Sequence, residues 1–193
     1  MSESNRISLL SEIYQFTDVH QYKLSLQKHA YARLVRSSCR ELMHSPFKSK
    51  LFFDALLGSD FYQYNNVGYL SLPAAGVHGP FLTERMSSAD YQLLPDGAWF
   101  SQIMELIQQP KWQLPRLEND QAVKVMNALG GLFRGNITAY RLTLCDDFNR
   151  LRTSARAAHQ YHHEWSHALS EFHEYVLIDL SEGTCDCLIF AYE

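Results

Sequence analysis

The sequence predicts an α+β fold with a mostly helical N-terminal two-thirds and a small antiparallel sheet that includes a C-terminal β-hairpin. Two observations favour this class: apolar residues recur at helical spacing through much of residues 7–132, and strand-forming residues gather near the end of the chain. Helices first and strands late are typical of α+β proteins. The chain has 193 residues and no internal repeat, which fits a single domain over residues 1–193.

The N-terminal helices are predicted from apolar periodicity and from residues that start or stop helices. A short amphipathic stretch covers residues 7–14, and Asp18 can cap a long helix that runs to Met43. Pro46 fits the first turn of a third helix, and Gly58 fits its end. The long helix would carry an apolar stripe made of Tyr31, Leu34, Val35 and Leu42.

The middle of the chain is predicted as a strand over 66–72, a loop over 74–80, and helices over 99–107 and 122–132. Residues 137–144 leave two interpretations open. Alternation of Tyr140, Leu142 and Leu144 favours a strand, whereas Tyr140, Leu144 and Phe148 are also spaced as on a helix.

The last part of the chain is predicted as one helix followed by a hairpin. The helix runs from Asp147 to Phe172, and the hairpin pairs residues 175–180 with 185–192 across a turn at 181–184. Val, Ile, Tyr and Phe are frequent in both arms of the hairpin, as expected for strands.

Charge and cysteine content restrict the classes of function. The net charge is −4, and no Lys or Arg follows Arg156, so the acidic C-terminal third argues against a nucleic-acid-binding protein. No run approaches the roughly 20 apolar residues that cross a bilayer, and the polar N-terminus does not resemble a secretory signal. The four cysteines form no disulfide framework. Together these features predict a cytoplasmic protein with no membrane contact.

One motif carries recognisable chemistry. His163, Glu164 and His167 match the pattern HExxH, in which two His side chains four residues apart lie on one helical face and can bind one Zn²⁺. Glu164 would then act as the general base for a metal-bound water. The run His-Glu-Trp-Ser-His-Ala-Leu resembles the active-site helix of zincin metallopeptidases, and this resemblance implies a zinc-dependent hydrolase. Taken to His173, the resemblance covers eleven residues of the chain.

A third histidine extends the motif. His173 follows His167 by six residues, and the resulting spacing is similar to the three-ligand pattern of metzincins and of a family of zinc-dependent ribosomal-RNA endonucleases. That resemblance implies that His163, His167 and His173 bind the metal. Ser170 stands where both families have a glycine that breaks the helix. A carboxylate after the motif is the other source of a third ligand.

The same residues also fit an ordinary amphipathic helix. In this alternative, one face packs on the core and the opposite face is solvated. The core face would hold Ala158, Tyr161, Trp165, Leu169, Phe172 and Val176, and the solvated face Arg156, His159, His163, His167, Ser170 and Glu174. Two functions therefore remain: a peptidase-like zinc hydrolase, or a non-catalytic regulatory protein that binds a protein partner.

A basic stripe is the candidate contact surface for the second function. Arg33, Arg36 and Arg40 lie at helical spacing on the predicted long helix, where they could bind phosphate or an acidic partner. The alternative is a solvated helix face, since Glu41 offsets part of the charge.

Overall fold

The computed structural model describes residues 14–27, 30–63, 76–109, 115–133, 135–163 and 166–192. Its centre is a six-stranded antiparallel sheet with the strand order β1-β2-β8-β7-β6-β5. The strands are β1 (Thr17–Gln27), β2 (Ala30–Ser38), β5 (Tyr91–Leu93), β6 (Ile137–Leu142), β7 (Glu171–Asp179) and β8 (Thr184–Tyr192). The short strands β3 (Val77–His78) and β4 (Phe81–Leu82) form a separate hairpin.

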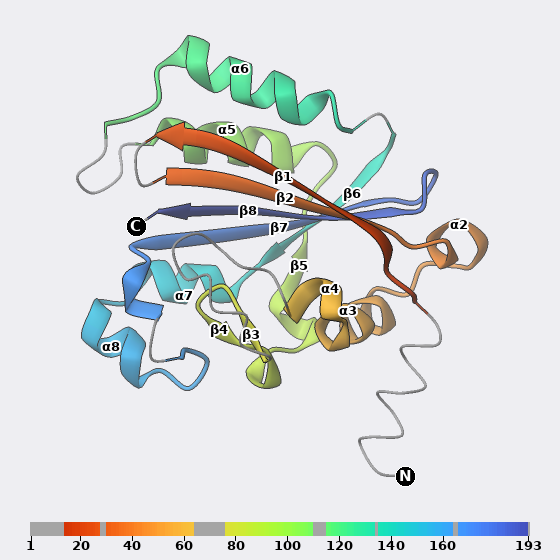
Figure 1. Cartoon of the computed structure of the whole chain (residues 1–193), viewed down its shortest axis with the longest axis horizontal. Helices are drawn as coiled ribbons and strands as arrows, with labels where there is room; N and C mark the ends of the chain where they lie inside the picture. The colour runs from red at the N-terminus through yellow and green to blue at the C-terminus, as the bar shows by residue number, and fades with distance from the viewer. Residues whose placement is uncertain are drawn as a thin grey trace.

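Helices cover both faces of the sheet (Figure 1). The helices α5 (Ala98–Gln108) and α6 (Asn119–Gly130) lie on one face, which we call the α5/α6 face. The opposite face, the α3/α7 face, carries α3 (Ser49–Gly58), α4 (Asp60–Gln63), α7 (Leu144–Arg150), α8 (Thr153–Ala158) and the β3–β4 hairpin. The remaining elements are α2 (Glu41–His44) and three 3-10 turns at Thr83–Arg85, Ser88–Asp90 and Ser166–Ala168.

The core consists of two layers, one on each face, because side chains alternate along a strand. In β8, Cys187 and Ile189 pack on the α3/α7 face, whereas Leu188 and Phe190 pack on the α5/α6 face. All four side chains are completely buried. A central strand covered on both sides needs a continuous apolar sequence, and this explains the composition of the C-terminal hairpin.

The predicted fold class is wrong, because strands are spread along the chain and the N-terminal two-thirds is not mostly helical. Residues 18–27 and 30–38, predicted as part of a helix from Asp18 to Met43, instead lie in the antiparallel strands β1 and β2. Ala30, Ala32 and Leu34 alternate onto the α5/α6 face, and β2 pairs with β8 from Ala30↔Tyr192 to Ser38↔Thr184. This long-range pairing overrides a local pattern that also fits a helix.

The predicted helix from Asp147 to Phe172 is also wrong. The chain instead forms α7, α8 and a 3-10 turn, and β7 already begins at Glu171. The Asn149 side chain accepts a hydrogen bond from the backbone N–H of Phe172 (2.9 Å) and donates one to its carbonyl (2.9 Å). It therefore pairs with β7 as a neighbouring strand would, at a point that β6 does not reach.

Other elements agree with the sequence. The helices α3, α5 and α6 and the β7–β8 hairpin are confirmed, and residues 137–142 form a strand. The predicted elements at 7–13 and 66–72 lie outside the described residues. All four cysteines are buried, unpaired thiols. In the described ranges, no helix has the length and apolar character needed to cross a membrane.

Candidate functional site

The HExxH residues do not share a helix. His163 lies in irregular chain and His167 in the 3-10 turn Ser166–Ala168, while Glu164 lies outside the described residues. Nε2 of His163 lies 2.8 Å from the carbonyl oxygen of Gly79. A carbonyl can only accept a hydrogen bond, so Nε2 carries the proton and donates it.

His173 lies on β7, in different surroundings from His163. Its Nε2 is 2.7 Å from Oε1 of Glu171 and 3.4 Å from Nδ2 of Asn149. Among the described residues, no group of three or more His, Cys, Asp or Glu side chains could hold a metal ion.

Zinc binding by His163, His167 and His173, with Glu164 as the base, stays a prediction. The helix that motivated it is not formed, so the shared helical face no longer supports it. The zinc content of untagged protein, compared with a His163→Ala/His167→Ala double variant, tests it directly.

The neighbouring His162 is buried beside the same segment. Its Nδ1 lies 2.9 Å from the carbonyl oxygen of Arg156, and its ring contacts those of Phe81 and Phe148. Burial lowers the pKa of His162, the carbonyl of Arg156 partly offsets this, and nearby His159, Arg156 and His163 lower the pKa further. In the unfolded chain, by contrast, a His has a pKa of about 6.5.

This difference predicts a loss of stability in acid. Below about pH 6.5 the unfolded chain binds a proton that folded His162 does not, so stability falls as the pH decreases, by at most about 1.4 kcal/mol per pH unit. His162→Phe keeps the ring contacts and removes the titration. Urea unfolding between pH 7.5 and 5 should show a shallower pH dependence for His162→Phe than for wild type. Equal slopes would contradict the assignment.

The three arginines predicted as one stripe lie apart. Arg33 and Arg36 are on β2, where an odd separation places them on opposite faces of the sheet, and Arg40 lies in the turn before α2. Arg33 donates a hydrogen bond to the side-chain oxygen of Gln21. The stripe required a helix, and the strand separates its members.

Arg36, which is partly buried, forms an ion pair with the buried Asp186. Its Nε donates to Oδ1 of Asp186 (2.7 Å) and its Nη2 to Oδ2 (3.0 Å), and Nη2 also donates to the carbonyl of Leu132 (2.8 Å). The hydrogen bond to Asp186 raises the pKa of Arg36, against the opposing effect of burial. Burial raises the pKa of Asp186, and the hydrogen bond and positive charge of Arg36 partly offset this increase. The charge of Arg36 is therefore neutralised within the protein.

A pocket of about 380 Å³ adjoins this ion pair, and we call it the hairpin pocket. It lies between the β7–β8 turn and the chain that follows α6. The pocket is lined by Arg36, Gly131, Leu132, Phe133, Ile137, Asp179, Glu182 and Thr184. Strand β2, the segment after α6 and the hairpin bring these residues together from distant parts of the sequence. The volume lies within the range of small-molecule sites.

The polar group at the hairpin pocket with the most defined position is Asp179. Its Oδ1 accepts hydrogen bonds from the Ser181 backbone (2.9 Å), the Ser181 hydroxyl (2.5 Å) and the Glu182 backbone (3.0 Å). These bonds belong to the turn of the β7–β8 hairpin and hold the carboxylate in one orientation. Asp179 is 4% exposed. Its Oδ2 accepts no hydrogen bond from the described part of the chain.

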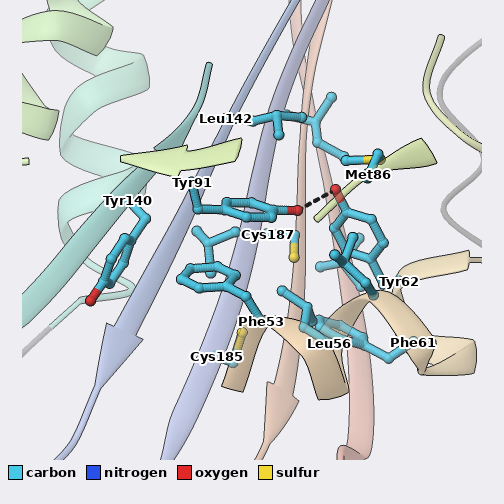
Figure 2. Close-up of a cluster of buried hydrophobic side chains, with 14 of the residues drawn as sticks. Phe53, Leu56, Phe61, Tyr62, Met86, Tyr91, Tyr140, Leu142, Cys185 and Cys187 are labelled. Atoms are coloured by element: carbon cyan, nitrogen blue, oxygen red, sulfur yellow. Dashed lines mark hydrogen bonds between the residues drawn. The ribbon is translucent and has the colours of Figure 1, made fainter. Parts of the chain in front are cut away.

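A second polar cluster lies inside the α3/α7 face and consists of Tyr62, His78, Tyr91 and Glu174, which we call the buried tetrad. The Tyr62 hydroxyl donates to Oε1 of Glu174 (3.0 Å), and the Tyr91 hydroxyl donates to the Tyr62 oxygen (2.6 Å). Figure 2 shows these two hydroxyls pointing toward one another among apolar side chains. The His78 ring stacks on Tyr62 at 3.6 Å and bonds to Oε2 of Glu174 through Nε2.

The buried tetrad has its hydrogen-bonding groups occupied internally. Nδ1 of His78 lies 2.9 Å from the carbonyl oxygen of Tyr62, so this nitrogen must be a donor. Its other nitrogen and both oxygens of Glu174 also have partners in the tetrad. Burial and the nearby Glu174 raise the pKa of both Tyr62 and Tyr91 well above the usual value, so both remain donors. His78 and Glu174 are completely buried, and the arrangement holds α4 and β3 against β7.

Sequence reasoning missed the tetrad because it placed Glu174 on the solvated face of a helix. Glu174 instead points to the core from β7, between Phe172 and Val176 on the same face. Once the strand is taken to begin at Glu171, an acidic residue at a core-facing position is a detectable signal. Asp179 and Asp186 give the same signal on the α5/α6 face.

Comparisons of this chain with protein families, curated proteins and solved structures found no match.

Proposed function

We propose that this protein is a non-catalytic binding protein and that its ligand-binding site is the hairpin pocket. The observation that carries the proposal is a pair of hydrogen-bonding groups without a described partner, in a pocket that apolar side chains also line. Asp179 Oδ2 is an acceptor and Arg36 Nη1 a donor that no described residue satisfies, and Leu132 and Ile137 line the same pocket. Ligand sites typically combine placed polar groups with apolar side chains, and both kinds line the hairpin pocket.

The chemistry of the two polar clusters supports binding over catalysis. The described residues that line the hairpin pocket include no His, Cys, Lys or Tyr, so Asp179 and Glu182 are its only described groups of the kinds that transfer protons or attack substrates, and Oδ1 of Asp179 is already bonded within the hairpin turn. The buried tetrad does contain such groups, but His78 and Glu174 are completely buried and bonded to one another. A substrate could reach neither without disrupting the core.

A blocking variant tests the proposed site. An added Cβ at Gly131 would lie 3.4 Å from the nearest backbone oxygen, and the φ angle of Gly131 is −66°, so Gly131→Leu places a side chain at the pocket without backbone strain. Gly130 is the matched control, because a Cβ there meets nothing within 4 Å and Gly130 does not line the pocket.

We expect fragments to bind wild type and Gly130→Leu, and to bind Gly131→Leu at least about tenfold more weakly, a loss of about 1.4 kcal/mol. Ligand-observed NMR with ammonium, carboxylate, zwitterionic and neutral fragments measures this. Binding that Gly131→Leu leaves unchanged, or no binding by any fragment class, would refute the proposal.

A further inference from the structure

Among the described residues, the charges around the hairpin pocket do not cancel. Arg36 is neutralised by Asp186, which leaves Asp179 and Glu182 as carboxylates of the lining. No cation of the described ranges forms an ion pair with either of them, and Arg134 lies outside those ranges. Asp179 raises the pKa of Asp186 by repulsion between the two carboxylates, and it raises the pKa of Arg36 by attraction. A bound cation would relieve that repulsion, whereas a bound anion would add to it.

One carboxylate oxygen of Asp179 has no hydrogen-bond donor among the described residues. The residue is 96% buried, given its 4% exposure, and Oδ1 already accepts three hydrogen bonds while Oδ2 accepts none from the described residues. The one completely enclosed side-chain atom without a partner in those residues is Oγ of Ser166, so Oδ2 of Asp179, a residue of the pocket lining, is not completely enclosed. Buried carboxylate oxygens are normally bonded, and a charged N–H donor forms the strongest such bond.

Gly135 makes room for this oxygen. An added Cβ at Gly135 would come within 2.1 Å of Oδ2 of Asp179, so any larger residue would displace the carboxylate. Leu132 and Ile137 contribute apolar side chains to the same pocket lining. The ring of Phe133 is already covered by the Arg36 guanidinium, 5.5 Å from the ring centroid.

We infer that the hairpin pocket binds a primary ammonium group on a short aliphatic stem, with the ammonium donating to Asp179 Oδ2 and the stem against Leu132 and Ile137. The inference rests on the proposed function, whose site it shares. Two sources could supply this group: a small alkylamine, or a lysine side chain of a partner protein.

Amide NMR of ¹⁵N-labelled protein tests the inference with three probes of equal length: 1-pentylamine, 1-pentanol and pentanoate. We expect pentylamine to shift the amides of Gly131, Leu132 and Thr184 saturably, and the other two probes to bind at least about tenfold more weakly. Cadaverine and Nα-acetyl-lysine N-methylamide are then compared. Preference for the first identifies a small amine and preference for the second a lysine side chain, and either supports the ammonium.

Two variants locate the interaction. Asp179→Asn keeps an oxygen for the bonds from Ser181 and Glu182 and loses the charge, and we expect it to weaken pentylamine binding at least tenfold. Gly135→Ala should weaken it similarly by displacing Asp179. Asp96→Asn, at an exposed position, is the matched control and should bind as wild type does.

The outcomes separate the two proposals. If pentanoate or pentanol binds more tightly than pentylamine, or if Asp179→Asn retains full affinity for pentylamine, the ammonium inference is overturned while the binding site stands. If no probe shifts the pocket amides, both the inference and the proposed function fail.

Discussion

Glu174→Leu is expected to lower the free energy of unfolding by about 4 kcal/mol, because it removes the acceptor shared by the buried tetrad. His78 Nε2 and the Tyr62 hydroxyl would then be buried without their partner. Each unsatisfied buried donor costs about 1–3 kcal/mol, more if it is charged. Urea unfolding followed by circular dichroism measures the loss.

Glu174→Gln is the matched control for this experiment. Its amide can accept from the Tyr62 hydroxyl and donate to Nε2 of a neutral His78, whose Nδ1 keeps its proton for the carbonyl of Tyr62. We therefore expect a loss of only about 1 kcal/mol. Equal losses for the Leu and Gln variants would show that hydrogen bonding within the tetrad does not determine stability.

A double variant separates the energy of the His78–Glu174 interaction from the cost of leaving one of the two groups buried without its partner. His78→Phe keeps a flat ring against Tyr62, and in His78→Phe/Glu174→Leu no unpaired charge remains. The double variant should lose at least about 2 kcal/mol less than the sum of the single losses, because most of each single loss comes from the stranded partner. Additive losses would contradict this explanation.

Arg156→Met is expected to lower the free energy of unfolding by about 3–5 kcal/mol. Arg156 is 6% exposed and donates to the carbonyls of Phe148 (2.8 Å), Leu169 (2.7 Å) and Ser170 (2.8 Å). Its guanidinium also stacks on the Phe148 ring at 4.2 Å. The substitution leaves three carbonyls without their donor and releases the segment before β7 from α7.

Hydrogen exchange locates this effect. The Ser170 amide donates to the carbonyl of Tyr192 (2.7 Å), and its protection should fall more than that of amides in β8 when Arg156 is replaced by Met. Arg156→Lys should recover little, since one ammonium cannot reproduce the planar set of donors. Arg152→Met, at an exposed position, is the control and should change stability by less than about 0.5 kcal/mol. An equal loss in the control would refute the assignment.

The elements predicted from sequence are those whose signals are local. The helix α3 follows Pro46 and ends at Gly58, and α5 and α6 have apolar residues at helical spacing on their buried sides. The turn of the β7–β8 hairpin contains Gly183 at φ 61°, a conformation that glycine adopts readily. In each case the residues that define the element lie within one or two turns of one another.

The candidate sites were harder to predict from the sequence than the secondary-structure elements. Arg36 was named from sequence as an anion-binding residue, but its partner Asp186 lies 150 residues away, so the neutralisation of its charge could not be seen. Likewise, nothing local marks Asp179 as a pocket residue or Gly135 as its neighbour. The HExxH pattern predicts a shared metal only if the segment is a helix, because a separation of four residues brings two side chains together on a helix and not in irregular chain. The pattern therefore assumes the helix and cannot itself establish it.

The sequence by itself determined the helices α3, α5 and α6, the C-terminal hairpin and the alternation of residues 137–142. Tertiary structure decided the rest. β2 becomes a strand because Ala30 to Ser38 pair with β8, and β7 begins at Glu171 because its partner strand extends to Tyr192. Strand pairing depends on residues far along the chain, whereas the helical spacing of Tyr31, Leu34 and Val35 is a local coincidence. Burial of Glu174 and the formation of the hairpin pocket follow from those pairings.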